Sequence, residues 1–158
     1  MNATDMPSSD VLDAVLTFLQ EEDWMHEKTD TDPITLRMRF ESDIAAWSCY
    51  ARVFVDKREF VFYSVFPIEV PQAYRAPLME GITRINSGLA QGNFEMDLAD
   101  GEILFKTSIA VVGDKLTPQL VRNLVYVNLG AMDQYFPALN QILYGLESPK
   151  DAIDPEPL

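Results

Sequence analysis

Cysteine and histidine each occur once in this chain of 158 residues, as Cys49 and His26. A single cysteine excludes an internal disulfide and is typical of a reducing compartment. A single histidine leaves few ways to build a catalytic dyad, because the nucleophile needs a base within reach. His26 falls in the acidic run 21–27, and we interpret it as a solvated surface residue near the end of a helix. Cys49 lies among apolar residues, and we interpret it as a buried core thiol.

Positive charge is also scarce, with 12 Lys and Arg against 25 Asp and Glu and a formal net charge of -13. Affinity for nucleic acid comes mostly from cations that neutralise phosphates, so we expect no nucleic-acid partner. Docking on anionic lipid is disfavoured for the same reason.

Long apolar runs are missing as well. No segment approaches the roughly 20 apolar residues of a membrane span. The first residues, MNATDMPSSD, lack the basic start and the apolar stretch of a secretory signal. We therefore expect a cytoplasmic protein with no membrane association.

Motifs that carry chemistry are absent too. Gly81, Gly88 and Gly92 follow a predicted helix and lack the spacing of a phosphate-binding loop. The Asp100-Gly101-Glu102 run lacks the alternating oxygen ligands and the closing Glu of a calcium loop. No serine occupies a G-x-S-x-G elbow. We expect no enzyme, with no catalytic residue, no cofactor and no metal site.

What the chain does contain is apolar: 47% of its residues are hydrophobic, enough to bury a core in one domain. Residues 1–8 show no periodicity, and the acidic segment 147–158 contains three prolines. We predict disorder in both and a single domain over 9–146.

The first half of the chain changes its hydrophobic period once. SSDVLDAVLTFLQEED has a helical stripe, with Ser8, Ser9 or Asp10 as its cap. After the turn-forming KTDTDP, three runs alternate with the period of a strand: ITLRMRFES, AWSCYARVFV and REFVFYSVF. The last run is apolar on both faces, which predicts a central strand covered on each side.

The second half predicts a helix from Gln72, then two strands flanking Asp100-Gly101, a hairpin signal. The spacing predicts a final helix over 117–145, with Thr117 as its cap and roughly 40 Å long. It is continuous, or bent or broken near Gly130 in the run NLGAM. The order α-βββ-α-ββ-α predicts an α+β fold with a mainly antiparallel sheet of five strands and helices packed on it.

Two segments are more apolar than one core face requires. The run 58–66 is rich in aromatics, which core packing explains first and an interaction surface second. The run 125–136 is apolar on several helix faces, which predicts either a central helix or one covered by a partner. A homodimer is the commonest such partner. The residues chosen as a possible protein-interaction surface are Phe60, Phe62, Tyr126 and Tyr135.

Three segments together resemble YbjN-domain proteins, with the cyanobacterial-type members most similar. They are REFVFYSVFPIEVP, INSGLAQGNFEMDLADGEILFKTSI and VRNLVYVNLGAMDQYFPALNQILYG, within a resemblance that spans about 10–145. The resemblance implies a fold similar to type III secretion chaperones, which is a curved antiparallel sheet with helices packed against it. Secretion chaperones of that fold are small, acidic and often dimeric, and they bind an extended client segment. YbjN proteins are labelled sensory-transduction regulators of poorly defined activity, so the resemblance implies no catalytic residues.

Our leading hypothesis is a non-enzymatic, cytoplasmic protein-binding regulator or chaperone-like adaptor, working as a homodimer on an unknown protein or peptide client. Docking would use an apolar groove or strand addition at an open sheet edge. The alternative is a small-molecule-sensing domain or an undetected enzyme, with an apolar pocket under the sheet. A third reading is a structural domain that contacts only its own copy. A closed pocket would favour the sensor, and a filled core with an exposed groove would favour the adaptor.

Overall fold

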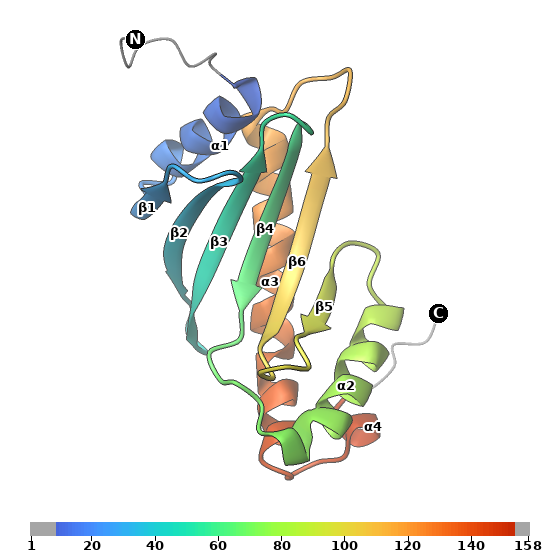
Figure 1. Cartoon of the computed structure of the whole chain (residues 1–158). Helices are drawn as coiled ribbons and strands as arrows, with labels where there is room; N and C mark the ends of the chain where they lie inside the picture. Colours follow the sequence, from blue (N-terminus) through green and yellow to red (C-terminus); the bar gives the residue numbers. More distant parts are fainter. Residues whose placement is uncertain (1–8, 154–158) are drawn as a thin grey trace.

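A computed structural model describes residues 9–153, in which six antiparallel strands form one sheet in the order β1-β2-β3-β4-β6-β5 (Figure 1). The strands are β1 (His26–Thr29), β2 (Ile34–Glu41), β3 (Ala46–Phe54), β4 (Glu59–Val65), β5 (Asn93–Met96) and β6 (Ile103–Ala110). The α+β class and the antiparallel sheet are confirmed.

The sheet has one strand more than the five predicted. β1 contains His26, which the sequence had suggested lies at a helix end, and it pairs with β2 from His26 opposite Met38 to Thr29 opposite Thr35. All four residues of β1 are exposed. Its sequence therefore lacks the alternation of apolar and polar residues by which a half-buried strand is recognised.

The described chain has four helices: α1 (Asp10–Glu21), α2 (Gln72–Ser87), α3 (Pro118–Leu143) and the short α4 (Pro149–Ala152). α3 packs on the central strands β4 and β6, behind the sheet in Figure 1, while α1 and α2 pack against α3 from either end. The strand residues facing the helices form the core with them, among them Leu36, Met38, Trp47, Cys49, Phe60, Phe62 and Phe105.

The opposite face of the sheet carries no helix of the described chain, as Figure 1 shows from the front. The expectation that β4 is central is confirmed, but the expectation of a cover on both sides is wrong. Tyr63 and Val65 are only half-buried there. Val61 is buried, and no helix of the described chain reaches that side of β4.

Asn128 is the polar contact at the centre of the helix–sheet layer. Its fully buried Nδ2 donates to the backbone oxygens of Phe62 at 2.9 Å and Phe105 at 3.1 Å, and to Thr107 Oγ1 at 3.2 Å. The Thr107 hydroxyl in turn donates to the Leu124 carbonyl at 3.1 Å. One residue of α3 is thereby bonded to both β4 and β6, which sets the rotation and level of the helix on the sheet.

The final helix is continuous, since α3 runs for 26 residues through Gly130, or about 39 Å at 1.5 Å per residue. Thr117 caps it as expected, accepting the Leu120 N–H, with Pro118 at the first position. An added Cβ at Gly130 would meet no atom within 4 Å. No close approach of another element requires glycine at this position.

The predicted C-terminal disorder over 147–158 is wrong for part of that segment. α4 is capped by the Ser148 hydroxyl and packs on α2, and Ile153 is only 7% exposed within the core. Ile153 and the partly buried Ala152 pack this turn against the core, and the average composition of the tail does not reveal them. The prediction for 1–8, like that for 154–158, lies outside the described residues.

The hairpin around Asp100-Gly101 is wider than a two-residue turn. β5 ends at Met96, so Leu98, expected in the strand, lies in the loop 97–102 and is exposed. Gly101 adopts φ 83°, and an added Cβ would collide with the Val70 carbonyl. The Gly101 carbonyl accepts the Val70 N–H at 2.9 Å, which ties the loop to the chain entering α2.

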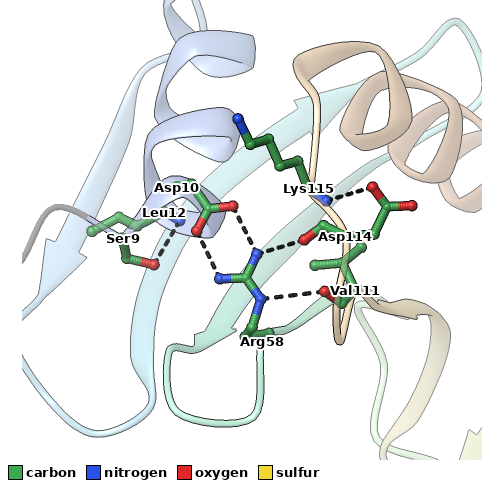
Figure 2. A network of polar contacts seen from close by, with 7 residues as sticks. All are labelled: Ser9, Asp10, Leu12, Arg58, Val111, Asp114 and Lys115. Atoms are coloured by element: carbon green, nitrogen blue, oxygen red, sulfur yellow. Dashed lines mark hydrogen bonds and ion pairs between the residues drawn. The ribbon is translucent and has the colours of Figure 1, made fainter.

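A second polar network joins the start of α1 to two loops at one end of the sheet (Figure 2). Arg58, at φ 54° in the β3–β4 turn, donates through Nη1 and Nη2 to both carboxylate oxygens of Asp10, each at 2.8 Å. The same guanidinium donates to the carbonyls of Asp114 at 2.8 Å and Val111 at 3.2 Å. Ser9 caps α1 next to this network. Arg58 thus fastens the start of α1 to the loop between β6 and α3.

We expect Gly130→Ala to stabilise the protein by roughly 0.5–1 kcal/mol, because alanine loses less backbone entropy in a helix and meets open space. Chemical denaturation measures the free energy of unfolding. Gly101→Ala is the control, and it should destabilise because of its positive φ and the clash with Val70. A loss of stability in Gly130→Ala would show that α3 bends at this position in solution.

We expect the Asp10–Arg58 pair to make stability depend on pH in the acid range. The hydrogen bonds from Arg58 hold the pKa of Asp10 below its ordinary value of 3.8. The stabilisation is therefore complete above that value and is lost as the pH falls through the lower pKa of the folded state. In thermal melts, Asp10→Asn should unfold at a lower temperature than wild type near neutral pH, and the gap should close in acid.

Glu80→Gln is the matched control for Asp10→Asn, because Glu80 pairs with Arg84 on the exposed face of a single helix. Its effect on the melting temperature should be smaller, since exposed pairs within one helix contribute little. A gap between Asp10→Asn and wild type that stays constant down to the lowest pH would contradict the assignment.

Candidate protein-binding surfaces

The four residues predicted as an interaction surface do not lie together on the surface. Phe60 and Phe62 are each 1% exposed, and they face α3 in the core. Tyr135 is half-buried, with its ring edge-on to Phe94 at a centroid distance of 6.2 Å. Tyr126 alone is largely open to solvent, at 48% exposure.

Tyr126 joins α3 to α1. Its hydroxyl donates to Glu22 Oε2 at 2.7 Å, and this hydrogen bond raises the pKa of Tyr126. Arg122 pairs with the same carboxylate at 2.6 Å and places its guanidinium 5.6 Å from the ring centroid of Phe18. The polar end of Tyr126 is therefore engaged within the molecule.

The expected core thiol is confirmed. Cys49 is fully buried with Sγ 3.7 Å from Ser64 Oγ, and burial raises the pKa of the thiol to about 12. The thiolate needed for nucleophilic or redox chemistry is thus disfavoured at neutral pH. His26 is exposed on β1, with Nδ1 3.1 Å from the Trp24 carbonyl oxygen.

Within residues 9–153, no three side chains of His, Cys, Asp or Glu come together in a way that could hold a metal ion. None of the helices in this range combines the length and the apolarity needed to cross a membrane. Five hollows on the described surface, of about 220 Å³ to 360 Å³, are open to solvent.

One of these hollows lies where the sheet is incomplete. β5 pairs with β6 only over residues 103–106, whereas β4 pairs with β6 as far as Ala110. Residues 107–110 of β6 therefore form a free sheet edge, visible in Figure 1 above the upper end of β5, where that strand starts.

The hydrogen-bonding direction of this edge follows from its neighbours. Ile103 accepts from Phe66 on the β4 side, and Glu102 accepts from Asp97 on the β5 side. Because successive residues of a strand alternate, Ser108 and Ala110 direct their N–H and C=O groups away from β4. No backbone group among residues 9–153 pairs with them.

The hollow beside this edge, about 360 Å³, is called the edge groove below. Its apolar part comes from β6 and from the start of α3, and Val127, 37% exposed, follows on the next turn of α3. No charged side chain lines it, although the chain carries a net charge of -13. The lining residues are Gln91, Gly92, Thr107, Ser108, Ile109, Leu120, Asn123 and Leu124.

The uncovered side of the sheet is a second candidate surface. Strand register aligns Arg37, Tyr50, Tyr63 and Lys106 in one row across β2, β3, β4 and β6. Arg52 lies over Tyr63, with its guanidinium carbon 5.4 Å from the ring centroid. The open face, as we call it, comprises Arg37, Arg39, Ser48, Tyr50, Arg52, Phe54, Val61, Tyr63, Val65, Leu104 and Lys106.

Sequence reasoning missed both surfaces, although it had part of the signal for one. The alternation in β2 and β3 placed Arg37, Arg39 and Arg52 opposite the apolar residues. Which strands lie side by side, and which half of β6 is left unpaired, depends on pairings between segments far apart in the chain. Local periodicity does not contain that information.

Comparison with known proteins agrees with this fold. The family model YbjN, described as "Putative bacterial sensory transduction regulator", matches residues 12–141. Among solved structures, the chain is similar to "YbjN, a putative transcription regulator from E. coli", with a TM-score of 0.56 and 14% sequence identity. The match covers 85% of this chain and 90% of that one. Curated proteins give no match.

Proposed function

The chain belongs to the YbjN family, and on that premise we propose that it is a non-enzymatic, cytoplasmic protein-binding regulator or adaptor that works as a homodimer. The observation that carries the proposal is the free edge of β6 beside an apolar strip of α3. Unpaired peptide groups next to exposed apolar side chains are the elements of strand addition, a common mode of protein recognition.

The non-enzymatic part of the proposal is supported by the state of the reactive side chains. Cys49 is buried with a raised pKa, and Asp10 is held by Arg58. The hollows that we describe open to solvent, whereas ligand sites in enzymes and sensors bury most of a small molecule. These observations favour the adaptor over a small-molecule sensor.

A second copy fits the free edge in one register. If two β6 strands pair antiparallel about a two-fold axis at Ile109, Ser108 of each copy faces Ala110 of the other. Both residues direct their peptide groups outward, so these two pairs satisfy the free N–H and C=O groups of both copies. Moving the axis to Ser108 would bring Ala110 opposite Lys106, which is already paired with Asn93.

The surroundings of the edge also favour a second copy. Leu120 and Leu124 of α3 flank the free edge of β6. In a dimer paired through β6, the same two residues of the second copy would cover them. A chain with a net charge of -13 repels its own kind. The uncharged lining of the edge groove makes this the part of the surface where such repulsion is weakest.

We expect the wild-type chain to sediment as a dimer and Ser108→Pro to sediment as a monomer in analytical ultracentrifugation. Proline removes an N–H that points away from β4, so the β4–β6 ladder is kept while the outward bond is lost. Circular dichroism and the melting temperature of the isolated monomer check that the variant folds.

Ser108→Thr is the matched control, because it keeps the N–H and suits a strand, and it should remain a dimer. A wild-type chain that stays monomeric over a wide concentration range would overturn the homodimer. If Ser108→Pro and Ser108→Thr both stay dimeric, the copies meet at another surface.

A further inference from the structure

The open face differs from the rest of this acidic molecule. Arg37, Arg39 and Arg52 are exposed there, and no carboxylate oxygen of the described residues lies within 4.0 Å of their side-chain nitrogens. Elsewhere, Arg58, Arg84 and Arg122 each pair with Asp or Glu, and Arg75 donates to the carbonyls of Val70 and Leu98. The chain has 25 acidic residues, so three guanidinium groups without a carboxylate partner on one face mean that positive charge is concentrated there.

Acidic residues of the open side stand at its margins. Glu27 is on the edge strand β1, and Glu95 is on β5, where it pairs with Lys106. Glu41 ends β2 and Glu59 begins β4. Arg37 is opposite Glu27 in the strand register, yet no carboxylate pairs with it, with Arg39 or with Arg52 among the described residues. The three arginines on β2 and β3 therefore carry unpaired positive charge between these marginal acids.

Apolar and aromatic side chains lie between the arginines. Val65 is opposite Leu104 on β4 and β6, Val61 is on the other side of Tyr63 along β4, and the rings of Tyr50 and Tyr63 are half-buried. Hollows of about 350 Å³ and 300 Å³ lie at opposite ends of the face, one beside Arg39 and one beside Phe54. A partner that fits must combine carboxylates with apolar groups.

We propose that the open face binds an extended acidic segment of a partner protein, one in which carboxylate side chains alternate with apolar ones. Arg37 and Arg39 are two residues apart on one strand, so their Cα atoms are about 7 Å apart. Alternate residues of an extended segment repeat at the same distance. Successive side chains of an extended segment project to opposite sides. In a segment running along β3, the carboxylates would project toward Arg37 and Arg39 on β2, and the apolar side chains would project the other way, over Tyr50, Val61 and Tyr63.

Two other occupants fit less well. A second copy stacked face to face would bring the same unpaired arginines together across a two-fold axis. A nucleic acid would place phosphates along a path that ends on Glu27, Glu59 or Glu95, and the net charge of -13 repels it at long range. A short segment with few carboxylates and several apolar residues is repelled less than a nucleic acid, and it can end before it reaches Glu27, Glu59 or Glu95.

This inference names the client surface of the proposed regulator, and it is tested separately from the dimer. The probe is a fluorescein-labelled peptide of alternating Glu and Val, titrated with the protein and followed by fluorescence anisotropy. We expect binding that weakens with added salt, because exposed charge pairs are screened. The double variant Arg37→Glu/Arg39→Glu should weaken binding roughly tenfold or more, since hydrogen bonds to charged groups are lost.

Lys115→Glu/Lys150→Glu is the matched control, because it changes the net charge equally at exposed positions away from the open face. It should keep nearly full affinity. The inference is overturned if the acidic peptide does not bind, or if the control loses as much affinity as the arginine variant. It is also overturned if a Lys–Val peptide binds equally well.

Two further measurements would show that the open face binds something other than an acidic segment. Preferential binding of a single-stranded oligonucleotide over the peptide, lost in Arg37→Glu/Arg39→Glu, would assign the face to nucleic acid instead. A wild-type dimer that dissociates in this variant, under the sedimentation conditions used for Ser108→Pro, would assign the face to a second copy.

Discussion

The bond from Asn128 to the sheet is the contact around which this molecule is arranged. Its amide nitrogen lies between two backbone carbonyls and the Thr107 hydroxyl, so only the donor end of the amide can face the strands. Burying an amide is unfavourable unless it is hydrogen-bonded, so other positions of α3 on the sheet would leave Asn128 buried without these donors satisfied. Apolar packing alone tolerates small shifts of a helix, but this polar contact favours one position.

The open surfaces follow from that position. α3 covers the centre of one sheet face along about 39 Å, and α1 and α2 complete the cover by packing against it. No helix of the described chain is left for the other face. β5 begins only at Asn93, directly after Gly92, which has φ 73° and where an added Cβ would lie 2.7 Å from the Phe105 ring. The chain turns into β5 beside Lys106 and leaves the rest of β6 without a neighbour.

The sequence predicts features that depend on neighbouring residues, and it misses those that depend on contacts between segments far apart in the chain. The alternation in β2 and β3 correctly placed Leu36 and Cys49 on the buried face, and the cap at Thr117 was found from Thr-Pro. β1 was missed because all its side chains are exposed, so its sequence shows no alternation. This strand is defined by its pairing with β2, which lies later in the chain. Phe60 and Phe62 were chosen as surface candidates, but α3 covers their face. The Arg58 network joins residues 48 positions apart along the chain, which no periodicity can reveal.

The edge groove and the open face would bind their partners through different interactions. One small domain could therefore pair with a second copy and bind a client at the same time. The edge groove has peptide groups and uncharged side chains, so added salt does not weaken pairing through it and screens the repulsion between two copies of charge -13. The open face has unpaired arginines, so its attraction for an acidic segment is screened by salt. Pairing two copies through β6 would join their sheets edge to edge and place the two open faces on the same side of one larger sheet. A client with two acidic segments would then gain affinity from the second contact without any new type of interaction. Self-association would in this way control client binding although the two surfaces share no charged residue.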